Sequence, residues 1–186
     1  MTILDKAIIF ATEAHSGSFR KGTTIPYILH PVEVASIAAR LTDDHEVIAA
    51  AVLHDVIEDT DTTKERLEEL FGKRITELVC ADSEDKREEC PATETWEVRK
   101  GETLQSIPDA SRDEQIIILA DKLSNIRSIY HDYTQIGDEL WNRFNMKDKS
   151  KHGWYYGGVA ERLDKLTDTN AYKEYVELIN KVFGSK

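Results

Sequence analysis

The sequence lacks the features of a secreted, membrane-bound or nucleic-acid-binding protein. No apolar run is long enough to span a bilayer. The amino-terminal stretch carries Asp5 and Glu13 without a basic opening, so it does not resemble a signal peptide. Cys80 and Cys90 match no CxxC metal spacing and are expected to be incidental thiols in a reducing compartment. A net charge of −11 argues against a nucleic-acid surface. We therefore expect a cytoplasmic protein without nucleic-acid or membrane partners.

The chain has 186 residues, 40% hydrophobic and 32% charged, which suits one globular domain with a substantial core. Almost every periodic segment has helical spacing, and no convincing strand pair is present. The sequence therefore predicts an all-α protein with residues 1–186 in a single domain. Residues 17–30 are expected to form a loop, and the highly charged residues 81–92 to be exposed or mobile. The predicted helices cover about 3–14, 44–56, 93–106, 138–147, 151–166 and 170–183, with others beginning after a His30 cap, at Thr62 or Thr63, near Ile75 and at Ser111.

The most informative stretch is AAAVLHDVIEDT, residues 49–60, in which an apolar run ends in a histidine and three carboxylates. Burying such groups without a partner is costly, and a divalent cation with a water is a natural partner. His30 lies upstream and Asp121 downstream, which completes the order H…HD…D. This mixed imidazole and carboxylate set suits Mn²⁺, Fe²⁺ or Zn²⁺ better than Ca²⁺. The pattern favours a metal-dependent phosphohydrolase, with Glu58 and Asp59 placed to orient the water and accept its proton.

Simpler interpretations exist for each residue alone. The second His-Asp pair, His131-Asp132, lacks a buried lead-in and is expected at the surface. His30 alone is compatible with a helix cap, and Asp121 with a partner for a nearby lysine. Glu58 and Asp59 are compatible with a solvated acidic helix end. The combination of these residues is what favours catalysis.

Three motifs together resemble the hydrolase domain of RelA/SpoT homologues, which belongs to the HD superfamily. They are RK…PYILHPVEVA from Arg20 to Ala35, LHDVIEDT from Leu53 to Thr60, and LADKLSN from Leu119 to Asn125. The similarity runs from about residue 4 to residue 130. It implies an HD-type helical bundle with core motifs at 15–130, closed by carboxyl-terminal helices at 138–183.

The resemblance implies hydrolysis of the 3′-diphosphate of the alarmone (p)ppGpp, with release of pyrophosphate and GDP or GTP, usually with Mn²⁺. It implies four metal ligands, namely His30, His54, Asp55 and Asp121. It implies Glu58 and Asp59 as the pair that activates water. It implies nucleotide contacts from Arg20, Lys21, Asn125 and Ser128, to which we add Lys122 as a candidate.

The chain also departs from the family pattern. Lys122 and Ser124 replace an Arg and a His that the family often has, which leaves guanine and adenine alarmones both open. The chain has no room for a synthetase domain, so a stand-alone small hydrolase is expected. Arg99 or Lys100 is a candidate phosphate contact. The alternative, that both are ordinary exposed side chains, is equally compatible with the sequence.

The segment KDKSKHGWYY, residues 147–156, concentrates cations and aromatics in an otherwise acidic chain. Tyr155 and Lys151 are interpreted as closing the substrate pocket, and Trp154 as a core anchor. Two rival functions remain, namely another HD nucleotide phosphohydrolase such as a 5′-nucleotidase, and a non-catalytic nucleotide sensor. The partner is a small-molecule nucleotide, and the sequence does not indicate the oligomeric state.

Overall fold

The computed structural model describes all residues except 83–86, 88 and 185–186, and its described part is helical. An isolated bridge between Phe19 and Pro26 is the only β pairing among the described residues, so the predicted all-α class is confirmed. The α-helices are α1 (Ile3–Ala14), α2 (Leu29–Ala38), α3 (His45–Leu53), α4 (Val56–Asp59), α5 (Lys64–Phe71), α6 (Lys73–Asp82), α7 (Ala92–Ser106), α8 (Arg112–Ile136), α9 (Lys149–Arg162) and α10 (Asn170–Phe183). The 3₁₀ helices are η1 (Ile107–Asp109), η2 (Gly137–Arg143) and η3 (Asp164–Leu166).

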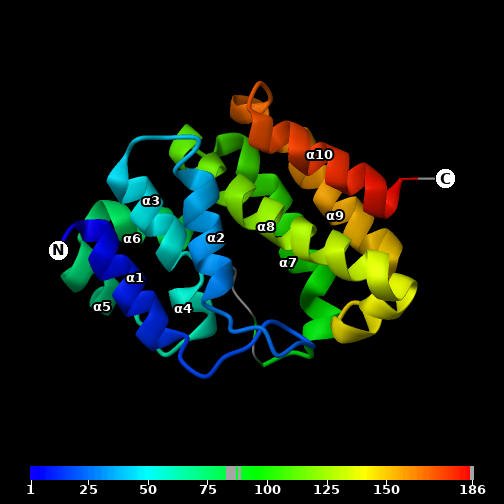
Figure 1. The fold of residues 1–186 in the computed structure, drawn as a ribbon, viewed down its shortest axis with the longest axis horizontal. Helices are drawn as coiled ribbons and strands as arrows, with labels where there is room; N and C mark the ends of the chain where they lie inside the picture. Colours follow the sequence, from blue (N-terminus) through cyan, green and yellow to red (C-terminus); the bar gives the residue numbers. More distant parts are fainter. Residues whose placement is uncertain (83–86, 88, 185–186) are drawn as a thin grey trace.

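The long helix α8 lies in the middle of the bundle and packs against α2 and α3 on one side and α10 on the other (Figure 1). The helix α3 packs against α1, α2 and α6, and all its residues from Val47 to Leu53 are buried. A helix that is apolar on every face belongs in the interior of a bundle. The core therefore runs from α3 through α8, and these two helices carry the HD and LAD motifs.

Local signals fix where the main helices begin and end. Thr2 with Asp5, and Ser111 with Glu114, form reciprocal capping boxes that satisfy the first amide groups of α1 and α8. Gly137 ends α8 at φ +57°, in the left-handed region that glycine adopts without strain. The 25-residue helix α8 is thus defined at both ends by the sequence.

Three predicted boundaries were wrong. The helix expected over 44–56 ends at Leu53, so that His54 and Asp55 form a turn before α4. The helix α2 begins at Leu29 rather than after a His30 cap, because a proline fits anywhere in a first turn, where no amide needs an intrahelical partner. Over 138–147 the chain instead forms the 3₁₀ helix η2.

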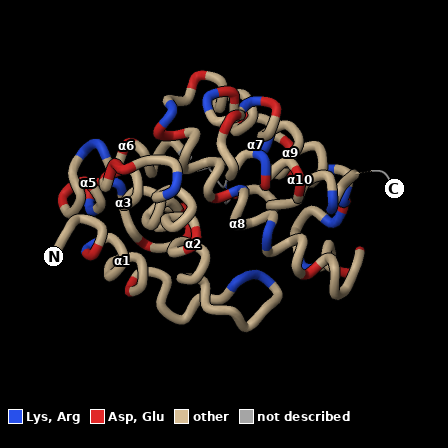
Figure 2. The backbone as a smooth tube through the Cα atoms, turned by 45° about the horizontal axis from the view of Figure 1, so that its top comes forward, with Lys and Arg blue, Asp and Glu red and all other residues tan. Residues whose placement is uncertain are grey.

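The described parts of 81–92 include the end of α6 and the first residue of α7, so this segment is not wholly a loop. Ala81, Glu89 and Cys90 are exposed, while residues 83–86 and 88 lie outside the described residues. No described helix has the length and apolar character needed to cross a membrane. Over the same residues, basic and acidic positions are mixed along the helices rather than gathered on one basic face (Figure 2).

Candidate metal centre and adjoining pockets

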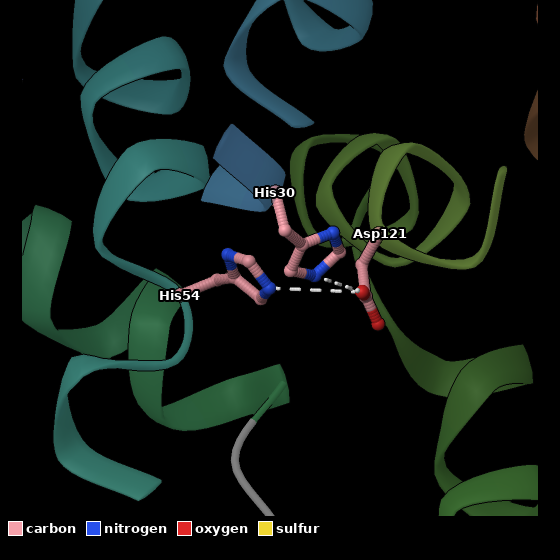
Figure 3. Close-up of side chains that lie close together, drawn as sticks. All are labelled: His30, His54 and Asp121. Carbon is pink, nitrogen blue, oxygen red and sulfur yellow. Dashed lines mark ion pairs between the residues drawn. The ribbon is translucent and has the colours of Figure 1, made fainter. Parts of the chain in front are cut away.

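Three buried side chains from different elements converge at the centre of the bundle. His30 comes from α2, His54 from the turn after α3, and Asp121 from α8 (Figure 3). Asp121 Oδ1 lies 3.0 Å from His30 Nε2 and 3.6 Å from His54 Nε2. One ion bonded to each donor at about 2.1 Å tolerates donor separations up to about 4.2 Å. Both separations from Asp121 therefore fit a single ion.

Asp55 joins this cluster through the break between α3 and α4. Its Oδ2 lies 3.0 Å from His54 Nε2 and 3.6 Å from His30 Nε2. Adjacent residues of a regular helix point about 100° apart. The turn at His54 and Asp55 instead directs both side chains to the same point. The structure thus brings together the four residues predicted as ligands.

Hydrogen bonds behind the two histidines fix which nitrogen faces the cluster. His54 Nδ1 donates to the backbone oxygen of Ala51 at 2.9 Å. Ser124 Oγ donates to Glu33 Oε2 at 2.8 Å, and it therefore accepts from His30 Nδ1, also at 2.8 Å. Each ring thus turns its Nε2 toward the cluster, as in metal sites whose ligands are oriented by outer partners.

The electrostatics of the cluster also favour a cation. Burial alone would lower the pKa of His54, but Asp55 and Asp121 outweigh it and hold that pKa well above its usual value. Burial would raise the pKa of Asp121, but Lys122 and the two histidines hold it well below its usual value. His54 Nε2 is buried and makes no hydrogen bond with a described residue. The two carboxylates thus favour a positive charge at this buried nitrogen, and a divalent transition-metal ion would supply that charge in place of a proton.

Tyr27 connects the metal centre to the acidic pair. Its hydroxyl donates to Asp55 Oδ2 at 2.5 Å and lies 2.9 Å from Asp59 Oδ2. Burial, reinforced by the charges of both aspartates, raises the pKa of Tyr27 above its usual value, so the phenol stays protonated as a donor. Glu58 and Asp59 line the cavity that opens over the cluster.

This cavity, the polar pocket, has a volume of about 170 Å³. Arg20 Nη2 donates to Asn125 Oδ1 at 2.6 Å, and Asn125 Nδ2 donates to Asp121 Oδ1 at 2.6 Å. Lys122 forms an ion pair with Asp121. The polar pocket is lined by Arg20, Tyr27, His30, Asp55, Glu58, Asp59, Lys100, Asp121, Lys122 and Asn125.

A second cavity of about 150 Å³, the adjoining pocket, shares Arg20, Tyr27 and Asn125 with the polar pocket. Lys21 and Ser128 line it, together with apolar side chains from α8, η2 and α9. The predicted nucleotide contacts therefore lie on one continuous surface that starts at the metal centre.

The carboxyl-terminal candidates lie outside both pockets. Lys151 pairs with Glu97 at 2.6 Å. Tyr155 is buried, with the amino groups of Lys100 and Lys122 4.8 and 5.9 Å from its ring centre, so it contacts pocket residues without lining either pocket. The prediction that Trp154 anchors the core was wrong, since 47% of it is exposed.

His131 is exposed as expected. Asp132, from the same second His-Asp pair, lines the adjoining pocket, where it accepts from Arg143 at 2.6 Å.

The sequence reasoning gave no role to Tyr27, Ser124 or Glu33, although each contacts the candidate ligands or their partners. Signals for two of them were available. Tyr27 precedes His30 by three residues, and Ser124 follows Asp121 by three on the same helix face. The link from Glu33 to Ser124 joins two helices, and only the tertiary structure shows it.

The described residues thus form an all-helical bundle in which two histidines and two aspartates from three helical regions meet beside a polar cavity, an arrangement that could hold a metal ion. The family model described as "HD domain" matches residues 7–145. The chain belongs to this family.

Two sequence relatives carry the same enzyme name, guanosine-3′,5′-bis(diphosphate) 3′-pyrophosphohydrolase. The Danio rerio protein MESH1 is 34% identical over 174 residues, which cover 91% of this chain and 87% of the relative. The Haemophilus influenzae protein is 41% identical over 123 residues, covering 65% of this chain and 18% of that longer relative.

Two solved structures share the fold. One is a metazoan orthologue of SpoT that hydrolyses ppGpp, with a TM-score of 0.78, 24% identity and coverage of 100% and 98% of the two chains. The other is a Listeria monocytogenes protein, with a TM-score of 0.74, 28% identity and coverage of 90% and 100%.

Proposed function

We propose that this protein hydrolyses the 3′-diphosphate of (p)ppGpp, releasing pyrophosphate and GDP or GTP. The observation that carries this proposal is the convergence of His30, His54, Asp55 and Asp121 at a pocket whose lining also includes three cationic side chains. The similarity to the MESH1 pyrophosphohydrolase over 91% of the chain supports it. We also propose that residues 1–186 act as a single HD hydrolase domain.

We propose Mn²⁺ as the resident ion, held by the same four side chains. An imidazole and carboxylate set suits this class of ion. When bound, it would screen phosphate charge and lower the pKa of a coordinated water.

Charge explains why an ion is needed for this substrate. Arg20, Lys100 and Lys122 face four carboxylates across the polar pocket, which gives its described lining a net charge of −1 with neutral histidines. A divalent ion changes this to +1, and the pocket then attracts a diphosphate rather than repelling it.

The roles of the other residues follow from their positions. Glu58 and Asp59 orient the attacking water and accept its proton, and Tyr27 fixes Asp59 relative to the metal ligand Asp55. The water oxygen bonds to the phosphorus attached to the 3′ oxygen. The bond from that phosphorus to the 3′ oxygen breaks, the 3′ oxygen gains a proton, and pyrophosphate leaves.

The two connected cavities suit the two parts of the substrate. The polar pocket takes the 3′-diphosphate, with Arg20, Lys122 and Asn125 as contacts. The adjoining pocket takes the nucleoside, with Lys21 and Ser128 near its sugar or 5′-phosphates. Lys151 and Tyr155 are retained as candidates for closing this surface.

The deciding experiment incubates Mn²⁺-loaded protein with ppGpp and with its adenine counterpart, with and without a chelator, and separates the products. Pyrophosphate and GDP that disappear with chelator support the proposal. Faster turnover of the adenine alarmone would reassign the base. Inorganic phosphate from a 5′-monophosphate would favour a nucleotidase, and tight ppGpp binding without products would favour a sensor.

A further inference from the structure

One large cavity is separate from the metal centre. It has a volume of about 730 Å³, within the range of small-molecule sites. It lies along α8 between the carboxyl-terminal half of α2 and the start of α10, a region at the top of Figure 1. None of its lining residues lines the polar pocket or the adjoining pocket. We refer to it as the α2–α10 groove.

The groove presents two arginines that form no ion pair with any residue the structure describes. Arg40, in the turn after α2, and Arg112, the first residue of α8, are exposed and line it, and their guanidinium groups have no hydrogen bond or ion pair with the described residues. In a chain of net charge −11, unpaired guanidinium groups in one cavity form a local positive site. Arginine pairs with phosphate oxygens through two parallel hydrogen bonds.

Two of the three carboxylates that line the groove already form ion pairs with Arg127. Arg127 donates to both oxygens of Glu174, at 2.7 and 2.8 Å, and to Glu33 Oε1 at 2.9 Å. The charged residues among the described lining are three arginines and three carboxylates, a net charge of zero, and Arg40 and Arg112 are the two arginines that make no ion pair with them. An anion that enters the groove therefore meets Arg40 and Arg112 and competes with Glu33 and Glu174 for Arg127.

The wall of the groove is connected to the metal centre by hydrogen bonds. Glu33 accepts from Arg127 through one oxygen and from Ser124 through the other. Ser124 in turn accepts from His30 Nδ1, whose Nε2 faces the cluster. An anion that draws Arg127 toward the groove would loosen Glu33, and so change how Ser124 orients His30.

We propose that the α2–α10 groove binds a phosphate-bearing small molecule through Arg40 and Arg112, and that its occupancy alters turnover at the metal centre through Glu33 and Ser124. The binding claim stands on the groove alone, whereas the effect on turnover rests on the proposed alarmone hydrolysis.

Binding is tested by calorimetry on the full chain loaded with Mn²⁺, titrated with inorganic phosphate and with guanosine 5′-monophosphate. The test variant is Arg40→Gln with Arg112→Gln. The matched control is Arg66→Gln with Lys73→Gln, which removes the same charge from exposed positions outside the groove. We expect the test variant to lose one binding event or to bind at least tenfold more weakly, while the control binds like wild type.

Identical titrations of the test variant and the control would overturn the site. Binding of inorganic phosphate with no gain for the nucleotide identifies the phosphate group as the feature recognised. If guanosine 5′-monophosphate binds more tightly than inorganic phosphate, and Asp168→Asn abolishes that difference in affinity, the base is recognised too. Both outcomes support the groove.

The effect on turnover is tested by ppGpp hydrolysis at saturating inorganic phosphate. We expect kcat to change at least twofold in wild type, and not in the arginine variant or in Glu33→Gln. A change in KM alone that persists in the arginine variant would place phosphate at the metal centre and refute the coupling. If wild type hydrolyses no ppGpp, the proposed function fails, while calorimetry still decides whether the groove binds.

Discussion

Replacement of Tyr27 by Phe tests whether one hydroxyl joins the metal centre to the acidic pair. The phenol contacts Asp55 Oδ2 at 2.5 Å and Asp59 Oδ2 at 2.9 Å. The substitution removes only the oxygen, and the ring keeps its contacts with His15 and His30, whose ring centres lie 4.8 and 5.9 Å away. We therefore expect Tyr27→Phe to fold normally and to reveal the role of the hydroxyl.

The expected magnitude follows from the two carboxylates. A hydrogen bond to a charged group contributes about 1.5–3 kcal/mol. The hydrogen bond to Asp59 contributes less free energy because Asp59 is exposed. Most of the lost free energy therefore comes from the hydrogen bond to Asp55, a candidate metal ligand. Since about 1.4 kcal/mol is tenfold in an equilibrium constant, we expect Mn²⁺ to bind about 10- to 100-fold more weakly. Turnover at saturating Mn²⁺ should fall about tenfold or more, because Asp59 is no longer held beside the water.

The assay is Mn²⁺ titration by calorimetry, paired with ppGpp hydrolysis at saturating metal. Tyr172→Phe is a matched control, because it removes a hydroxyl that donates to the backbone oxygen of Ala160, outside both pockets. The control should match wild type in both measurements. Mn²⁺ affinity and kcat within twofold of wild type in Tyr27→Phe would refute the reasoning.

Four further outcomes are expected. Asp121→Asn removes a charge that faces both histidines, so elemental analysis should find no bound ion and turnover should vanish; a fully loaded, active variant would contradict the site. Glu58→Gln should keep the ion but lower kcat by about two orders of magnitude or more, and a near-normal rate would remove Glu58 from the mechanism. Leu53→Ala, at a fully buried position, should cost about 2–5 kcal/mol in urea unfolding. Gly22→Ala, at φ +70° with its new β-carbon 2.7 Å from Arg143 Cδ, should cost about 1–2 kcal/mol and raise KM for ppGpp, whereas an unchanged KM would show that this loop does not shape the pocket.

The helical class was predictable because the periodicity of each segment is a local property. The capping residues Thr2 and Ser111 and the stop at Gly137 act on neighbouring amides, so α1, α8 and their ends can be read from the sequence. The helix over 44–56 was predicted too long because its apolar pattern continues through Val56. Nothing local shows that convergence on the cluster breaks the helix at His54 and Asp55.

Errors also occurred where packing, rather than pattern, decides exposure. Trp154 was expected in the core, yet it is about half exposed, while its neighbour Tyr155 is buried. Adjacent residues on a helix face different directions, and which one meets the core depends on how α9 packs against α7 and α10. The sequence of α9 alone does not contain that information.

The sequence by itself determined the helical elements, the apolar character of α3 and α8, and which residues have side chains that can bind a metal ion. Their chemistry depends on the side chains present and on short-range spacing. Only the tertiary structure decided that His30, His54, Asp55 and Asp121 meet, that Tyr27 and Ser124 orient them, and that a separate groove forms over α8. These contacts join residues up to 94 positions apart, and such distances are set by the packing of whole helices rather than by any local pattern.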